Sequence, residues 1–406
     1  MEASILENDS KKFAQMLIVL GIMGFLANGD NYAVAPLLIN ISSDLGIPIA
    51  KTALSVTSYM LCFGFFTIFF GPLGDRYGKT RVINIAAFGT AIFSILGAFS
   101  FNLTSLIIFR ACNGAFGAGI FPVSIAFIGE SSQDANRQKM LGKFFGMMFL
   151  GSASATAIGG AIAYFASWRA VYFIYGVLEL VMAFIMLKTL EKKPGVLQQL
   201  DLRKVYQEAF SNRELIQVVG TIFLIGFSIF GTFTYSGRFI QNNTGYNILK
   251  VGLILTFFGA ATVLGGRKAS TLREILDTKF VPYAAILGAI SLVSLSFSHS
   301  PILLSISLFG FGYAFVSIHS TLVTTAQGLM PKLRGTVMSL VSFNLFVGGA
   351  VGTYVNGIVL EKVGIEWIFV LSAVFMLIIL FISTRVVDLS LNRLNKKSIK
   401  TPFTGI

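Results

Sequence analysis

The chain has 406 residues, of which 55% are hydrophobic and only 12% are charged, and its mean hydropathy is +0.78. A soluble domain carries roughly 25% charged residues, so this composition excludes a soluble enzyme, a disordered protein and a disulfide scaffold. The net charge of +13 indicates either a nucleic-acid partner or the excess of bases that membrane proteins carry in cytoplasmic loops.

The first residues include Glu2, Glu7 and Asp9, and the apolar run that follows has no small-residue cleavage site. We therefore predict no cleaved signal peptide and expect the first span to direct insertion. Cys62 and Cys112 both lie inside apolar runs, so neither a structural disulfide nor a metal site is expected.

A window of about 20 apolar residues, the length that crosses a bilayer, predicts twelve membrane helices. In chain order they are 13–38, 50–73, 82–100, 103–129, 139–166, 168–189, 214–239, 247–266, 280–297, 301–326, 334–360 and 364–386. A polar segment at the midpoint, which contains Pro194-Gly195, divides them six and six. The sequence thus predicts an all-α membrane protein with bundles over 1–189 and 214–386, a linker over 190–213 and a tail over 387–406.

Basic residues predict the orientation of these spans. If both termini are cytoplasmic, 25 of the 31 Lys and Arg residues lie on the cytoplasmic side and 5 on the outer side, with Arg110 alone inside a span. A bias of this size sets topology. It also accounts for the net charge without a nucleic-acid partner, and none is expected.

Spans five and eleven resemble each other at an offset of 197 residues. Arg137 then falls on Arg334, Gly151 on Gly348 and Gly160 on Gly357. Any two glycine-rich membrane helices look somewhat alike, but matches in one register favour a repeat. Two halves of the same orientation, related by an axis along the membrane normal, are a known plan among transporters.

The segment GPLGDRYGKTRV, residues 71–82, is predicted to form a tight cytoplasmic turn between spans two and three. Its glycines allow positive φ and close backbone approach, and Asp75 can cap a helix or pair with a base. An ordinary basic loop would have the same properties. The spacing, however, resembles the signature G-x-L-a-D-R-x-G-R/K-R of the major facilitator superfamily, with matches at Gly71, Leu73, Asp75, Arg76, Gly78 and Lys79.

The resemblance covers the whole chain, because the topology, the linker and the repeat also fit. It implies a twelve-helix transporter with two pseudo-symmetric halves and alternating access. In this family the loop latches the cytoplasmic side and its aspartate contacts the eleventh helix; the resemblance assigns that role to Asp75, supported by Gly71, Arg76, Gly78 and Lys79. The equivalent segment of the second half, LGGRKASTLREILDTKF, lacks the pattern, so we expect an asymmetric latch.

Two further motifs match in part. Span four has Arg110, Asn113 and Gly114 in a pattern similar to the R-x-x-Q-G of proton-coupled members, with a shorter amide. Span five is similar to the antiporter motif G-x-x-x-G-P-x-x-G-G but has Ala155-Thr156 where the family has Gly-Pro. The glycines that remain allow close helix packing, which needs no transport role; they are Gly151, Gly159 and Gly160.

Asp30 and Arg110 are predicted to lie at similar depth. Asp30 is 18 residues beyond Lys12 and Arg110 is 8 residues beyond Asn102, which correspond to about 27 and 12 Å from opposite ends. A neighbouring base favours an ionised carboxylate and burial favours the protonated form. Our hypothesis is that Asp30 is the principal proton-coupling carboxylate and Arg110 modulates it; a static ion pair is the alternative.

The sequence leaves open the roles of the other polar residues in the spans. Glu179 is either a second protonatable group turned inward or a protonated residue near lipid. His319 is either a satisfied polar residue or a coupling site, and Arg238 either attracts an anion or snorkels to the interface. The resemblance places helices one, four, seven and ten around the cavity; the cavity candidates are Asn31, Tyr32, Tyr59, Asn113, Tyr235, Arg238, His319 and Asn344.

The sequence favours a proton-driven exporter of a small organic molecule, a drug or a metabolite, with no cofactor beyond the proton gradient. Forty phenylalanines and twelve methionines suit a pliable apolar cavity. No phosphate-binding loop, nucleophile–base pair or metal cluster indicates an enzyme. The alternatives are a proton symporter for a small polar nutrient or anion, bound by Arg110 and Arg238, and a transport-inactive receptor or lipid-binding protein. We expect a monomer in the cytoplasmic (inner) membrane.

Overall fold

The computed structural model describes residues 2–131, 134–192, 194–195, 202–330 and 333–399, and over these ranges it contains helices and no strand. The first half comprises α1 (Glu2–Leu45), the short α2 (Ile49–Thr52), α3 (Leu54–Tyr77), α4 (Lys79–Ala98), α5 (Leu103–Ser131), α6 (Asp134–Phe165) and α7 (Trp168–Thr189). The predicted all-α class is confirmed.

The second half begins after a linker that contains α8 (Leu202–Ser211). It comprises α9 (Arg213–Thr244), α10 (Ile248–Leu276), the 3-10 turn η1 (Asp277–Lys279), α11 (Phe280–Ser296), α12 (Pro301–Leu329), α13 (Arg334–Lys362) and α14 (Glu366–Ile399). Among the described residues, eleven helices are long and apolar enough to cross a membrane. The twelfth predicted span, 364–386, falls on α14, of which Glu366–Ile382 is an apolar helix.

Local sequence sets where several of these helices start and stop. The side chains of Ser167, Asn212 and Asn247 accept hydrogen bonds from the first turns of α7, α9 and α10, which satisfies amides that have no partner within the helix. Gly245 ends α9 at φ +66°, a left-handed conformation that glycine adopts without steric cost.

The predicted turn over residues 71–82 is shorter than expected. Helix α3 continues to Tyr77 and α4 starts at Lys79, so Gly78 at φ +93° is the whole connection. Gly71 and Gly74 therefore lie inside a helix and serve close packing, not turn formation. The apolar window ended the span early because the last turn of α3 carries Asp75 and Arg76, which project from the membrane end.

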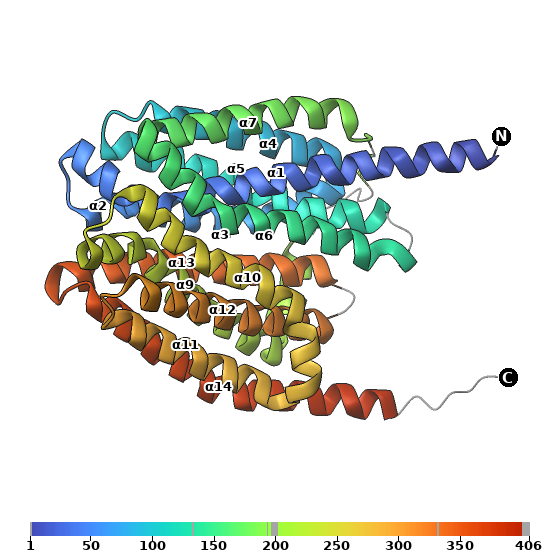
Figure 1. The fold of residues 1–406 in the computed structure, drawn as a ribbon. Coiled ribbons are helices and arrows are strands. Elements are labelled where there is room, and N and C mark those ends of the chain that lie inside the picture. The colour runs from blue at the N-terminus through green and yellow to red at the C-terminus, as the bar shows by residue number, and fades with distance from the viewer. Residues whose placement is uncertain (1, 132–133, 193, 196–201, 331–332, 400–406) are drawn as a thin grey trace.

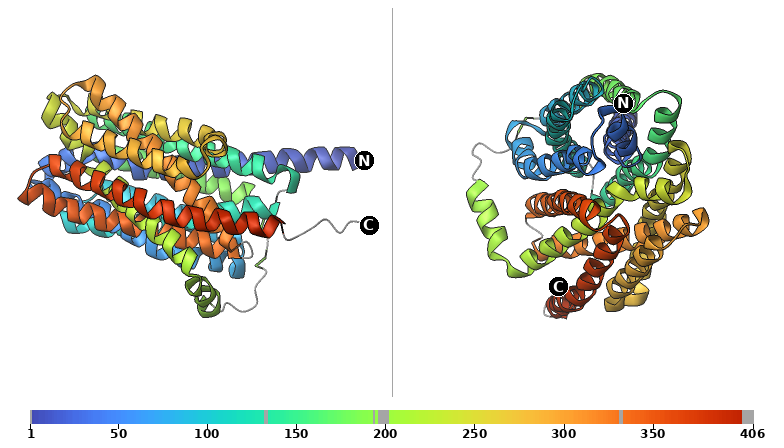
Figure 2. Two further views of the ribbon diagram at one scale, coloured as in Figure 1. Left: turned by 90° about the horizontal axis from the view of Figure 1, so that it is seen from below. Right: turned by 90° about the vertical axis from the view of Figure 1, so that its left-hand side faces the viewer.

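The helices lie side by side in two bundles, with both termini at the same end of the molecule (Figure 1). Viewed along the helices, α1–α7 occupy one side and α9–α14 the other (Figure 2). An even number of crossings places the termini at one end, as the basic-residue pattern predicts.

The two halves repeat one packing arrangement. A side chain at Gly151 on α6 would meet the Phe25 carbonyl of α1, and a side chain at Gly348 on α13 would meet the Phe223 carbonyl of α9. The predicted repeat is therefore visible as equivalent helix pairs. Glycine is needed at both positions because the neighbouring backbone occupies the space of a Cβ.

Two helix pairs make the most extensive contacts between the halves. Helix α3 packs on α13, with the Phe63 and Phe346 rings stacked at 4.0 Å. Helix α6 packs on α10, where the Thr156 and Thr256 hydroxyls are 3.2 Å apart. Each pair takes one helix from each bundle, so these two seams run between the bundles.

Candidate functional site

Asp30 on α1 and Arg110 on α5 form a buried ion pair. Arg110 Nη1 donates to Asp30 Oδ2 at 3.2 Å, and each side chain is only 1% exposed. The same nitrogen donates to Asn113 Oδ1 at 3.3 Å, and Asn113 Nδ2 donates to the Thr90 carbonyl of α4 at 2.9 Å. Residues from three helices thus fix one guanidinium.

Two tyrosine rings cover the rest of the guanidinium. Arg110 Cζ lies 4.3 Å from the ring centre of Tyr59 on α3 and 5.2 Å from that of Tyr172 on α7. A desolvated cation is stabilised by the negative faces of such rings. The aromatic cover keeps the charge inside the first bundle and away from lipid.

Small residues let the helices approach closely enough to build this arrangement. A side chain at Gly114 would collide with the Tyr59 carbonyl, and one at Gly29 would collide with the Tyr175 ring. The partial R-x-x-Q-G match therefore has a structural counterpart: its glycine allows α3 to bring Tyr59 over Arg110.

Glu179 on α7 is turned into the bundle and not toward lipid. It is fully buried, and it follows Tyr172 and Tyr175 on one helix face at spacings of three and four residues. Its two carboxylate oxygens have no hydrogen-bond partner among the described residues. The sequence left open which way Glu179 points, because α7, the sixth membrane helix, has both a lipid face and a bundle face.

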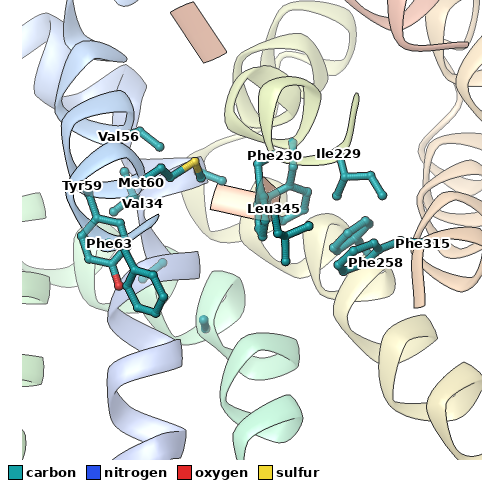
Figure 3. Close-up of a cluster of buried hydrophobic side chains, with 14 of the residues drawn as sticks. Val34, Val56, Tyr59, Met60, Phe63, Ile229, Phe230, Phe258, Phe315 and Leu345 are labelled. Atoms are coloured by element: carbon teal, nitrogen blue, oxygen red, sulfur yellow. The ribbon is translucent and has the colours of Figure 1, made fainter. Parts of the chain in front are cut away.

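A small cavity lies between the two halves, one residue along α1 from Asp30. Its volume is about 20 Å³. The lining residues include Asn31, Tyr32, Val56, Met60, Phe230 and Phe233. Figure 3 shows Met60 directed from α3 toward Phe230 and Leu345 of the second half. The site between the bundles is therefore aromatic and apolar, with a few polar atoms from α1.

The cavity brings together only some of the predicted residues. Asn31 and Tyr32 line it, whereas Tyr59 and Asn113 contact Arg110. Tyr235 is fully buried and donates to the Thr353 carbonyl at 2.8 Å, so it braces α9 against α13. The sequence missed Met60, Phe230 and Phe233, since nothing distinguishes them from the other apolar residues of their spans.

The remaining cavity candidates lie elsewhere. The His319 ring lies tilted against Phe315 with ring centres 5.4 Å apart, and Asn344 Nδ2 donates to the Leu340 carbonyl within its own helix. Arg238 borders a wider hollow, of about 610 Å³, at the end opposite the termini. It shares that hollow with Ser42, Ser43 and Asn242, so it lies at a mouth of the molecule and not at its centre.

Charged residues gather at the end that carries the termini. Lys79 is 6% exposed, and its Nζ lies 2.7 Å from Asp75 and 2.6 Å from Glu130 of α5. Asp75 thus pairs with the neighbouring Lys79. The eleventh membrane helix, α13, is approached by Gly71, whose Cβ position is 3.5 Å from Ser339 Oγ. Glu130 was missed, although an acid at the end of span four beside a basic turn is a usable signal.

The glycines of α6, the fifth membrane helix, pack against two neighbouring helices. Gly151 and Gly159 face Phe25 and Ala33 of α1, and Gly160 faces Gly252 of α10. The first two hold the bundle together, and the third lies on the seam between the halves. No group of three or more His, Cys, Asp or Glu that could bind a metal occurs among the described residues.

Two six-helix bundles with glycine-lined seams, a cavity between them and a buried ion pair beside it are the architecture of a multi-pass membrane transporter. The Major Facilitator Superfamily model matches residues 20–353. The chain belongs to this superfamily, and the resemblance inferred from residues 71–79 is confirmed.

The chain is similar to several bacterial proteins. It is 21% identical over 345 residues to the uncharacterized MFS-type transporter YceJ of Bacillus subtilis (strain 168), covering 83% of this chain and 87% of the relative. It is 24% identical over 331 residues to the multidrug efflux protein YfmO of the same organism, covering 81% and 82%.

A solved structure shares the fold. A bacterial homolog of the human lysosomal transporter Spinster, in an inward-facing and unoccupied conformation, superposes with a TM-score of 0.79 at 14% identity, covering 94% of this chain and 98% of that one.

Proposed function

We propose that the protein is a proton-coupled exporter of small, largely apolar organic molecules, such as drugs or metabolites. The observation that carries the proposal is the buried Asp30–Arg110 pair, one residue along α1 from the cavity that Asn31 and Tyr32 line. Intramembrane ionisable residues of this kind mark ion pathways. The similarity to a protein named for multidrug efflux supports the direction.

Coupling follows because protonation of Asp30 accompanies release of substrate from the neighbouring cavity. While the pair is closed, the Arg110 guanidinium stabilises the ionised Asp30. When the seam opens to the outside, Arg110 moves away toward its tyrosine partners, and Asp30, without its counter-charge, takes up a proton from the acidic outer side. Substrate bound against Tyr32, Phe230 and Met60 leaves in that state, so each proton that enters accompanies export.

The proposal includes an orientation and a setting. Both termini face the cytoplasm, where 25 of 31 basic residues would lie, and the cytoplasmic membrane supplies the proton gradient. The chain acts as a monomer, because cavity and ion pair are contained in one copy.

Proteoliposomes with an imposed pH gradient test the proposal. Ethidium serves as an apolar cationic probe, together with neutral and anionic dyes, and a trapped pH dye reports proton movement. We expect proton movement opposite to probe movement in the wild type and loss of pH-driven transport in Asp30→Asn. Asp44→Asn, an exposed aspartate on the same helix, should keep it. Full pH-driven transport by Asp30→Asn would contradict the assignment.

A proton symporter for a small anion is the second candidate, favoured by Arg238 at the hollow opposite the termini. Under this alternative, proton and substrate move in the same direction, and Arg238→Gln raises the KM for an anionic substrate. The exporter proposal expects neither result.

A further inference from the structure

Glu179 lies in the same buried part of the first bundle as the Asp30–Arg110 pair. It projects from the α7 face that also carries Tyr175 and Tyr172, whose ring centre is 5.2 Å from Arg110 Cζ. Tyr175 brings this face of α7 against α1, because its hydroxyl is 3.1 Å from the Cβ position of Gly29, the residue before Asp30. The hydroxyls of both tyrosines have no partner among the described residues.

The charges in this cluster do not balance if every group is ionised. Two carboxylates surround a single guanidinium, and Arg110 Nη1 is bonded to Asp30 while Nε and Nη2 have no acceptor among the described residues. An ionised Glu179 would add an uncompensated negative charge in a water-free environment, which is strongly unfavourable. The cluster therefore holds one proton on its two carboxyl groups.

We propose that Asp30 and Glu179 share Arg110 and this one proton, and that the guanidinium changes carboxylate partner during the transport cycle. This inference rests on the proposed proton coupling and extends it to a second residue. In the step, protonated Glu179 gives its proton, through the Tyr175 hydroxyl, to ionised Asp30. Ionised Glu179 then receives the Nε and Nη2 donors of Arg110, and the net charge of the cluster is unchanged.

Among the described residues, the neighbouring helices place no other charged side chain in contact with the cluster. Asp30 comes from α1, Tyr59 from α3 and Arg110 from α5. Helix α4 faces the cluster with Ser94, whose hydroxyl donates to the Tyr172 carbonyl at 3.1 Å. Its ionisable residues, Lys79 and Arg81, lie at the end that carries the termini. On α6, Lys143 is exposed.

Infrared spectroscopy of the full chain in lipid vesicles tests the inference with protons as the only ligand. A protonated carboxyl group gives its own C=O stretching band. We expect this band in the wild type at neutral pH and its loss in Glu179→Gln. We also expect its loss in Asp30→Asn, because Glu179 then ionises against Arg110. Arg110→Gln should strengthen the band about twofold. Glu361→Gln, an exposed control, should leave it unchanged.

A band that survives in Glu179→Gln would overturn the inference, because another group would then carry the proton. A band that survives in Asp30→Asn would also overturn it, because Glu179 would then be protonated independently of the pair. Both substitutions keep the shape of the side chain, and elution as a single species verifies folding. If the wild type moves no protons with any probe, the proposed function fails whatever the spectra show. If transport is coupled to protons but the infrared bands differ from those expected, the proposed function stands and only the shared proton is ruled out.

Discussion

Arg110 joins four other residues in the interior of the first bundle. It meets a carboxylate, an amide and two aromatic rings contributed by four other positions of the bundle. Breaking a buried pair by removing one partner costs roughly 3–5 kcal/mol, because the other charge is left uncompensated.

Gly114 provides a prediction at this scale. Gly114→Ala should lower stability by about 1–3 kcal/mol, since its Cβ would collide with the Tyr59 carbonyl and overpack the α3–α5 contact. The same change should weaken pH-driven transport because Tyr59 is moved off Arg110. The melting temperature of the purified protein in detergent measures the first effect.

Gly117→Ala is the matched control for this prediction. Gly117 lies one turn further along α5, and its Cβ position is 3.5 Å from the nearest atom, the Tyr59 hydroxyl. That spacing is ordinary contact, so the melting temperature should change little. Equal losses in the two variants would mean that helix α5 tolerates alanine poorly in general, and the close approach at Gly114 would not be the cause.

The linker helix α8 is the element whose role the sequence did not indicate. The Tyr206 hydroxyl donates to the Ile68 carbonyl of α3 at 2.9 Å, and the helix also contacts α13. Burial raises the pKa of Tyr206, against a smaller opposing effect of a hydrogen bond with Ser339 of α13. The hydroxyl therefore remains a donor at neutral pH, and it holds α8 on the seam where α3 and α13 meet.

Tyr206→Phe should loosen this attachment without unfolding the bundles. A hydrogen bond contributes a net 0.5–1.5 kcal/mol, so the amides of α8 should exchange hydrogen roughly two- to tenfold faster. Hydrogen–deuterium exchange followed by mass spectrometry measures this change. Tyr283→Phe is the control because Tyr283 is 52% exposed. Unchanged exchange in α8 would mean that its apolar contacts alone hold it.

The two halves also differ in how their second and third helices connect. In the first half Gly78 makes the connection in one residue, and Lys79 follows between two carboxylates. In the second half the turn η1 intervenes, and Asp277 has φ +45°. The expected asymmetry of the predicted latch therefore has a geometric basis, because only the first half has a glycine at the bend.

At the scale of the whole molecule, the charge distribution gives a prediction of topology. In a background of Cys62→Ser and Cys112→Ser, we expect Lys51→Cys to react with a membrane-impermeant maleimide in intact cells. Lys192→Cys should react only after permeabilisation. Both positions are exposed and lie at opposite ends of the bundle. The reverse labelling pattern would show that the basic residues do not set the orientation of this chain.

The sequence alone predicted the all-α membrane class, the order of the membrane-spanning helices, the repeat and the superfamily, because twenty-residue apolar runs, basic loops and the motif at residues 71–79 are local signals. It also predicted that Asp30 and Arg110 lie at similar depth, since depth follows from helix rise. Direction around a helix axis is not a local signal, and the predictions were therefore less complete for Glu179, Tyr235 and the cavity.

Only the tertiary structure decided which faces meet. In the structure Glu179 points into the bundle, Tyr235 packs against α13, and Tyr32, Met60 and Phe230 line the cavity between the halves. In a membrane helix both faces are apolar, so hydrophobic periodicity, which identifies the buried side of a soluble helix, carries little information here. Packing of glycines against neighbouring backbones sets the rotation of each helix, and that depends on partners far apart in the chain.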